Sequence, residues 1–196
     1  MIDSNNLLNS ANKLFLKKHF ADAVLIYEKI LHREPKNLDA INNKGYALSK
    51  LKKYHDAIRA YDLGLKNNPL EQTLVINKIS ALRKMNMLNE ALHNCNNILK
   101  NSNELIVKYH KLRILFSLKK YQESLQICDE ILYLYPNNPD VLFDKALNLA
   151  LLGKNEDSIK SLNSAIVISK KFRIKAKNNK SFHALQKEPN FLKLVG

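Results

Sequence analysis

Two stretches of this sequence repeat one another and decide the fold: KKYHDAIRAYDLGLKNNP at residues 52–69 and KKYQESLQICDEILYLYP at residues 119–136. Both begin with two lysines and a tyrosine, place a small residue (Ala57 or Ser124) five positions after the first lysine, and end on a proline. Their apolar residues fall at helical spacing, so each stretch predicts a helix. Proline has no N–H to donate and disfavours helical geometry in the residue before it, so Pro69 and Pro136 mark helix ends.

The small residue recurs along the chain at a nearly constant period. A second apolar run at helical spacing precedes each of these helices, so every unit is expected to be a helical hairpin. Small residues allow two helices to approach closely, and short hairpins must bury their apolar stripes against neighbouring hairpins. The small residue is found at Ala23, Ala57, Ala91, Ser124 and Ser158, with spacings of 34, 34, 33 and 34 residues.

In these features the chain resembles the tetratricopeptide repeat (TPR) family. The period, the small residues, the closing prolines and the bulky residue four positions after each small one (Tyr27, Tyr61, Cys95, Cys128, Leu162) all coincide with the family pattern. The resemblance implies an all-α fold, a right-handed superhelical solenoid of five TPR hairpins with a short C-terminal helical cap. The implied array spans residues 1–172, with repeats at about 4–37, 38–71, 72–104, 105–138 and 139–172.

The departures from the family pattern are mild. There is no tryptophan, Ile79 and Leu112 stand where the first helix has a small residue, and one residue is missing between the third and fourth repeats. Asn103 and Lys170 replace closing prolines. We expect local changes of angle between hairpins.

Residues 173–196 form a basic closing segment. A terminal repeat exposes an apolar face that needs covering, so we predict that this segment is the helical cap. Its apolar side is expected to comprise Ala176, Phe182, Leu185, Phe191 and Leu194.

The sequence contains no catalytic or metal-binding constellation. Its six histidines are scattered, its two cysteines fit buried positions in successive repeats, and no glycine-rich loop is left to hold phosphate. The carboxylate pairs Asp129–Glu130 and Glu156–Asp157 are adjacent on helices, so their side chains diverge. We therefore predict a protein that is not an enzyme and has no cofactor or metal.

The resemblance implies a binding groove on the concave face, lined by one stripe of each first helix. We predict a protein-interaction scaffold or adaptor whose groove holds a peptide or partner segment, with acidic groups of that partner meeting Lys50, Lys84 and Arg113. The plain alternative is that the stripe is a solvated helix face. The implied groove residues are Asn12, Asn43, Tyr46, Lys50, Asn77, Arg83, Lys84, Tyr109, Arg113, Phe116 and Phe143.

A chaperone-tail partner is not expected. Some TPR proteins hold the terminal carboxylate of such tails with cationic and asparagine side chains, and only Asn12 and Asn43 match here. The cationic positions carry Leu8, Thr73 and Asn77 instead, so a buried carboxylate would lack its matching charges.

Two alternatives remain open. The net charge of +14 and the run KKFRIKAKNNK at residues 170–180 favour nucleic acid as a second-ranked partner, and the plain alternative explanation of the run is a Lys- and Asn-rich composition. Self-assembly could proceed by end-to-end stacking through Phe15, Leu16 and Phe20, and we expect a monomer or weak self-association. The candidate anion-binding residues are Lys170, Lys171, Arg173, Lys175, Lys177 and Lys180.

No stretch reaches the roughly 18 apolar residues of a spanning helix, and the first twenty residues lack the pattern of a signal peptide. The two isolated cysteines fit a reducing compartment. We therefore predict a cytoplasmic protein with no membrane partner.

Overall fold

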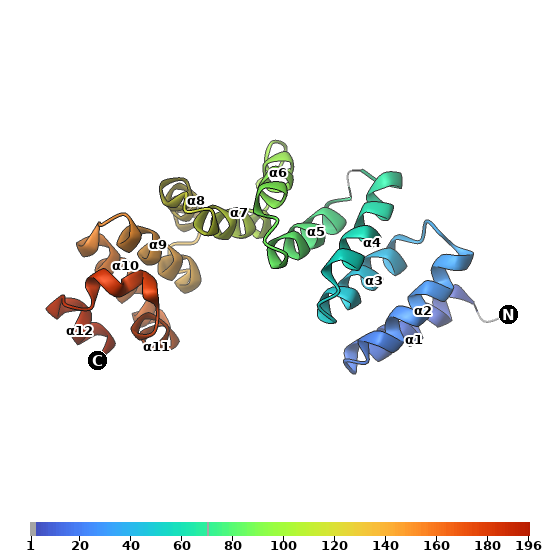
Figure 1. Ribbon diagram of the computed structural model, residues 1–196, viewed down its shortest axis with the longest axis horizontal. Coiled ribbons are helices and arrows are strands. Elements are labelled where there is room, and N and C mark those ends of the chain that lie inside the picture. The colour runs from blue at the N-terminus through green and yellow to red at the C-terminus, as the bar shows by residue number, and fades with distance from the viewer. Residues whose placement is uncertain (1–2, 70) are drawn as a thin grey trace. The chain divides into compact units, whose positions relative to one another are not determined.

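The computed structural model describes residues 3–69 and 71–196, and all regular secondary structure in them is helical (Figure 1). Residues 1–2, at the start of the predicted array, and residue 70, within its second repeat, lie outside the described residues. The chain divides into two compact units, one ending at Ser102 and the other beginning at Asn103. We call them unit 1 and unit 2.

Unit 1 consists of three successive helical hairpins. In each hairpin the two helices pack against one another, and the second helices α2 and α4 also pack against the first helix of the next hairpin. The pairs are α1 (Ser4–Leu16) with α2 (Phe20–Arg33), α3 (Leu38–Lys50) with α4 (Tyr54–Asn67), and α5 (Gln72–Lys84) with α6 (Leu88–Leu99).

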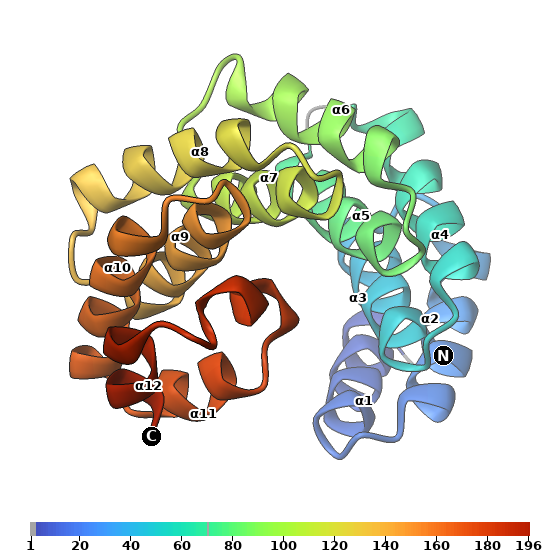
Figure 2. The ribbon, with the colours of Figure 1, turned by 60° about the vertical axis from the view of Figure 1, so that its left-hand side comes forward.

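Unit 2 contains two further hairpins and a closing segment (Figure 2). Helix α7 (Leu105–Ser117) pairs with α8 (Tyr121–Leu134), and α9 (Pro139–Leu151) pairs with α10 (Asn155–Ile168). The short helix α11 (Lys171–Lys177), the 3-10 helix η1 (Lys180–Leu185) and α12 (Pro189–Val195) follow. In the described residues no helix is long and apolar enough to cross a bilayer.

Every first helix ends in the same turn. In the second hairpin, the Lys52 N–H donates to the Ser49 carbonyl at 3.1 Å and the Lys53 N–H donates to the Leu48 carbonyl at 2.9 Å. These two bonds satisfy carbonyls that the helix end leaves open, and they require a left-handed residue at the turn. The residues in that conformation are Lys18, Lys52, Asn86, Lys119 and Gly153, with φ between 59° and 73°.

The core of unit 1 depends on small residues where helices cross. Ala11, Ala23, Ala57 and Ala91 are all fully buried. At Gly45 a Cβ atom would lie 2.4 Å from Cε1 of the buried Tyr61 ring, so only glycine lets α3 and α4 approach this closely.

Unit 2 uses serine at the same position of its second helices. Both serines are fully buried, and each hydroxyl donates a hydrogen bond to a carbonyl of the preceding helix. Ser124 Oγ lies 3.1 Å from the Leu112 carbonyl, and Ser158 Oγ lies 2.8 Å from the Ala146 carbonyl. The buried hydroxyls are therefore satisfied and also tie the two helices of each hairpin together.

One ion pair recurs between consecutive hairpins. A lysine of a first helix reaches a carboxylate sixteen residues earlier, on the second helix of the preceding hairpin. The pairs are Lys44–Glu28 at 3.0 Å, Lys78–Asp62 at 2.8 Å and Lys145–Asp129 at 2.7 Å. At the end of unit 1 the equivalent acidic position carries Asn96.

Candidate functional site

A hollow of about 290 Å³ opens on the first-helix face of unit 1. Helix α1 supplies Asn12 and Phe15, and α3 supplies Asn43 and Tyr46. Residues three apart share one face of a helix, so both pairs point the same way. The complete lining is Asn12, Phe15, Leu16, Tyr27, Asn43 and Tyr46.

One wall of the hollow is aromatic. The Phe15 and Tyr46 rings are stacked with centroids 5.4 Å apart, and Phe20 meets Phe15 edge-on at 5.1 Å. Tyr46 remains 41% exposed, and the Lys50 ammonium lies 4.9 Å from its ring centroid. The wall therefore combines apolar surface with an exposed cation at its edge.

A chain of side-chain amides begins in the hollow and continues beyond it to α5. Asn12 Oδ1 accepts hydrogen bonds from the Tyr27 hydroxyl at 2.7 Å and from Asn43 Nδ2 at 3.1 Å. Asn43 Oδ1 accepts from Asn42 Nδ2 at 3.4 Å, and Asn42 Oδ1 accepts from Asn77 Nδ2 at 2.8 Å. Burial raises the pKa of Tyr27, so its hydroxyl stays protonated as the donor. The amides fix one another's orientation.

The remaining groove residues predicted in unit 1 lie at the end of α5. Lys84 is exposed, whereas Arg83 is half-buried and already engaged in an interaction within the protein. The structure thus brings together Asn12, Asn43, Tyr46, Lys50 and Asn77 and leaves Lys84 as a peripheral cation.

In unit 2, the predicted polar groove residues contact α9 and the residue that caps its beginning. The Tyr109 hydroxyl accepts a hydrogen bond from Asn138, and Arg113 Nε lies 3.4 Å from Asp144 Oδ2. Burial raises the pKa of Asp144, although the Arg113 charge opposes this rise. Phe116 is half-buried and packs edge-on against Tyr121.

Phe143 does not line an open face. The side chain is only 7% exposed, and its ring lies 5.0 Å from the Phe172 ring and 5.9 Å from the Phe182 ring. The closing segment covers this part of α9, which corrects the expectation that Phe143 is available to a ligand. The groove was predicted from helical periodicity. That periodicity does not reveal whether a segment distant in the sequence covers the same helix face.

The six candidate anion-binding residues are all exposed, but two of them face groups of unit 2. Lys171 Nζ lies 3.6 Å from Asp140 Oδ2 and 4.7 Å from the Phe172 centroid, and Lys175 Nζ lies 4.9 Å from that centroid. Arg173 and Lys177 lie on α11, Lys170 precedes it as the N-cap residue, and Lys180 begins η1.

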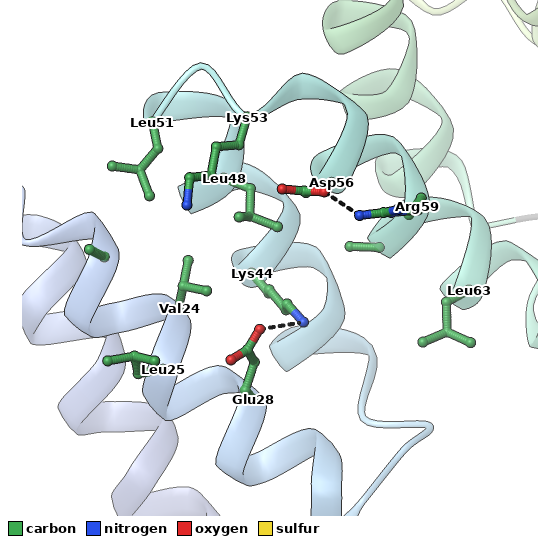
Figure 3. Close-up of a pocket in the computed structure, with 12 residues that line it drawn as sticks. Val24, Leu25, Glu28, Lys44, Leu48, Leu51, Lys53, Asp56, Arg59 and Leu63 are labelled. Carbon is green, nitrogen blue, oxygen red and sulfur yellow. Dashed lines mark hydrogen bonds and ion pairs between the residues drawn. The ribbon is translucent and has the colours of Figure 1, made fainter.

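Sequence reasoning missed a second hollow, on the second-helix side of unit 1. It has a volume of about 600 Å³ and lies between α2, α3 and α4 (Figure 3). Val24 and Leu48 form its buried apolar part, and Leu25 and Leu63 are 58% and 49% exposed at its sides. The ion pairs Glu28–Lys44 and Asp56–Arg59 flank it. Leu25 and Leu63 were the signal for this hollow in the sequence, but the groove prediction considered only the first helix of each hairpin.

Across residues 3–69 and 71–196, no three His, Cys, Asp or Glu side chains gather into a possible metal site. Cys95 and Cys128 are fully buried and form no disulfide, and burial raises the pKa of Cys128. Buried cysteines commonly pack as small apolar groups.

Known proteins share this architecture. The family model described as "Tetratricopeptide repeat" matches residues 26–59. The solved structure of YrrB, described as a TPR protein with an unusual peptide-binding site, has a TM-score of 0.73 and 19% identity, covering 90% of this chain and 93% of that one.

Two other solved structures are similar at comparable length. MamA from Desulfovibrio magneticus has a TM-score of 0.80 and 14% identity, covering 87% of this chain and 98% of that one. A thermophilic TPR protein of Thermus thermophilus has a TM-score of 0.64 and 14% identity, covering 88% of this chain and 96% of that one. No curated protein sequence matches the chain.

The family model covers one repeat length, so the count of five TPRs remains a prediction. The fold does not depend on that count, because the successive hairpins and the similar structures both show a TPR solenoid. The chain therefore has the fold of a tetratricopeptide repeat solenoid, and its residues 26–59 match the model of that family.

Proposed function

We propose that the chain is a protein-interaction scaffold that holds a peptide or partner segment on the first-helix face of unit 1. TPR solenoids in general present extended surfaces for binding other proteins. The hollow beside Phe15 and Tyr46 is the observation that carries the proposal, because it joins exposed aromatic surface to a row of oriented amides. Catalysis is not part of the proposal, since TPR solenoids are generally binding scaffolds.

Each part of the hollow has a role in this proposal. An apolar side chain of the ligand packs against Phe15 and Tyr46, because aromatic anchors contribute most of the affinity at interfaces. The Asn43 and Asn77 amides carry both donor and acceptor atoms, which match the C=O and N–H groups of an extended peptide.

Exposed cations of unit 1 favour an acidic ligand. Lys50 is exposed beside Tyr46, and Lys84 is exposed at the end of α5. Exposed ion pairs contribute only about 0–1 kcal/mol each, so these charges select and steer while the aromatic wall binds. We expect micromolar affinity. Arg113 contributes less than the sequence suggested, because it already pairs with Asp144.

The test is selection from a displayed random peptide library, followed by calorimetric titration of the selected peptides. Tyr46→Ala should lower affinity about tenfold, as expected for loss of an interface anchor. The matched control is Leu63→Ala, an exposed position in the second-helix hollow, which should leave affinity unchanged. Loss of binding with Leu63→Ala and not with Tyr46→Ala would assign the site to the second-helix side.

A second candidate function is nucleic-acid binding through the basic closing segment. Its support is the exposure of Lys170, Arg173, Lys177 and Lys180. Binding of a duplex should then weaken with salt at a log–log slope of about −0.9 for each neutralised phosphate. A flat salt response would remove this candidate.

Self-assembly by end-to-end stacking has weaker support. Phe15 and Phe20 pack against each other within unit 1, whereas Leu16 is 79% exposed. The other exposed positions of α1 include Asn5, Asn6, Asn9, Ser10 and Lys13, which are polar. Light scattering that shows a monomer at all concentrations would exclude stacking.

A further inference from the structure

The second helices of unit 2 end in exposed apolar side chains. Tyr133 and Leu134 at the end of α8 are 87% and 52% exposed, and Val167 and Ile168 at the end of α10 are 76% and 44% exposed. Ile174 on α11 is 69% exposed. These five residues form what we call the apolar edge.

The equivalent positions in unit 1 provide an internal comparison. Counting back from the helix ends, the pair Val167–Ile168 corresponds to His32–Arg33 on α2 and to Lys66–Asn67 on α4. Both of these pairs are polar, and the apolar pair that ends α6, Ile98–Leu99, is half-buried and not exposed. The end of a second helix therefore does not require exposed apolar residues for the hairpin to fold. Exposed apolar surface of this kind marks an interaction site, because contact with a partner removes it from water.

Cations lie directly beside the apolar edge. Lys170 and Arg173 follow Ile168 within five residues and are exposed. The Lys171–Asp140 pair holds the beginning of α11 near the beginning of α9. Because α9 begins five residues after Leu134, the ends of α8 and α10 lie at the same end of unit 2.

Three carboxylates near this edge are paired with lysines. Asp140 contacts Lys171, Asp129 contacts Lys145 at 2.7 Å, and Glu130 contacts Lys108 at 2.7 Å. The exposed cations of residues 170–177 therefore give the apolar edge a positive electrostatic potential.

A hollow of about 370 Å³ adjoins the same cations, between α10, α11 and α12. Three cationic and two amide side chains surround an apolar floor, and its lining contains no acidic residue. Such donors suit the oxygens of a phosphate group. The lining consists of Ile159, Lys160, Asn163, Arg173, Asn190, Lys193 and Leu194.

We propose that the apolar edge and its neighbouring cations bind the surface of an anionic phospholipid bilayer. The apolar side chains enter the headgroup region, and Lys170, Arg173 and Lys193 contact phosphates. Nucleic acid accounts for the cations but not for exposed Val167 and Ile174. An acidic protein would need a surface shaped to side chains protruding from three separate helices, whereas a fluid bilayer accommodates them without such a shape. The expectation of no membrane partner rested on the absence of a membrane-spanning stretch in the sequence. Attachment to the surface of a bilayer does not require a spanning helix.

The experiment is co-sedimentation of the full chain with vesicles. One set contains phosphatidylcholine alone, and the other contains phosphatidylcholine mixed with phosphatidylglycerol. We expect binding to the anionic set only. Lys170→Gln with Arg173→Gln should weaken it roughly twentyfold, since each basic residue at a membrane surface contributes roughly fivefold. Val167→Ser with Ile174→Ser should weaken it about tenfold by removing buried apolar area.

The matched control carries Lys29→Gln with Lys66→Gln, which removes the same charge from exposed positions of unit 1. It should change binding less than about twofold, and thermal melts of all variants should coincide with that of the native chain. Binding that falls with the cation variant but not with the apolar variant would overturn the proposal in favour of non-specific charge adsorption. Absence of sedimentation with anionic vesicles would also overturn it and would leave an acidic protein as the partner of the edge.

Discussion

At the scale of single residues, the packing of unit 1 depends on the missing side chain of Gly45. A Cβ atom there would lie 2.4 to 2.9 Å from three ring atoms of Tyr61, which is fully buried and cannot swing into solvent. Gly64 has a similar constraint, with Leu74 Cδ1 2.5 Å from its ideal Cβ position. Both glycines are therefore determined by contacts with the neighbouring helix.

We predict that Gly45→Ala destabilises unit 1 by about 1–3 kcal/mol, the usual cost of overpacking. Helix propensity alone predicts the opposite sign, because alanine is favoured over glycine by about 1 kcal/mol in a helix interior. Denaturant unfolding of Gly45→Ala, Tyr61→Leu and the double variant measures the coupling. Tyr61→Leu should make room for the alanine, so the second substitution should cost less in that background. A stabilised Gly45→Ala variant would show that Tyr61 can shift freely.

Asp144 predicts a pH dependence at the same scale. Burial raises its pKa in the folded protein, so the folded state holds this proton at pH values where the unfolded chain has lost it. Stability then falls as pH rises from about 4 through the folded pKa. Asp144→Asn should therefore increase the free energy of unfolding relative to the native chain more at pH 7 than at pH 4. A benefit that shrinks as pH rises would show that pairing with Arg113 outweighs burial.

At the scale of elements, the recurring feature is the left-handed turn after each first helix. Of the five turn residues, only Gly153 adopts this conformation without steric cost. The other four carry side chains and are Lys18, Lys52, Asn86 and Lys119. The turn is therefore imposed on most of its residues by the packing of the two helices that it joins.

We predict that Lys52→Gly stabilises the protein by about 1 kcal/mol and that Gly153→Ala destabilises it by a similar amount. The control is Lys53→Gly, one residue later, where φ is −83° and glycine has no advantage. Chemical denaturation of the three variants gives the comparison. Equal effects at positions 52 and 53 would mean that the left-handed conformation costs lysine nothing here.

The elements themselves could be predicted from the sequence, but the turns and the covered face could not. The spacing of Ala23, Ala57 and Ala91 and the prolines at positions 69 and 136 located helices within a few residues of their observed ends. Lysine has no preference for left-handed geometry, so nothing at Lys52 indicated the turn. Phe143 was assigned to an open face because helical period gives direction only, and it cannot reveal that Phe182 returns to cover the ring.

At the scale of the whole molecule, the closing segment is an integral part of the core of unit 2. Phe172, Phe182, Leu185 and Phe191 are nearly completely buried and belong to one cluster with Phe143. Residues 173–196 should therefore contribute to the free energy of unfolding of the hairpins that they cover. Removing one of these side chains should destabilise the hairpins that it covers and leave distant hairpins unaffected.

We predict that Phe182→Ala costs about 3–5 kcal/mol in unit 2, since the ring is buried against two other aromatic rings. The control is Leu192→Ala in the same segment, which is 51% exposed and should change stability by less than about 0.5 kcal/mol. Native-state hydrogen exchange resolves the location. Amides of α9 and α10 should lose protection in Phe182→Ala, and those of α1 to α4 should keep it. An equal loss in both units would contradict a local cap and show that the whole chain unfolds as a single cooperative block.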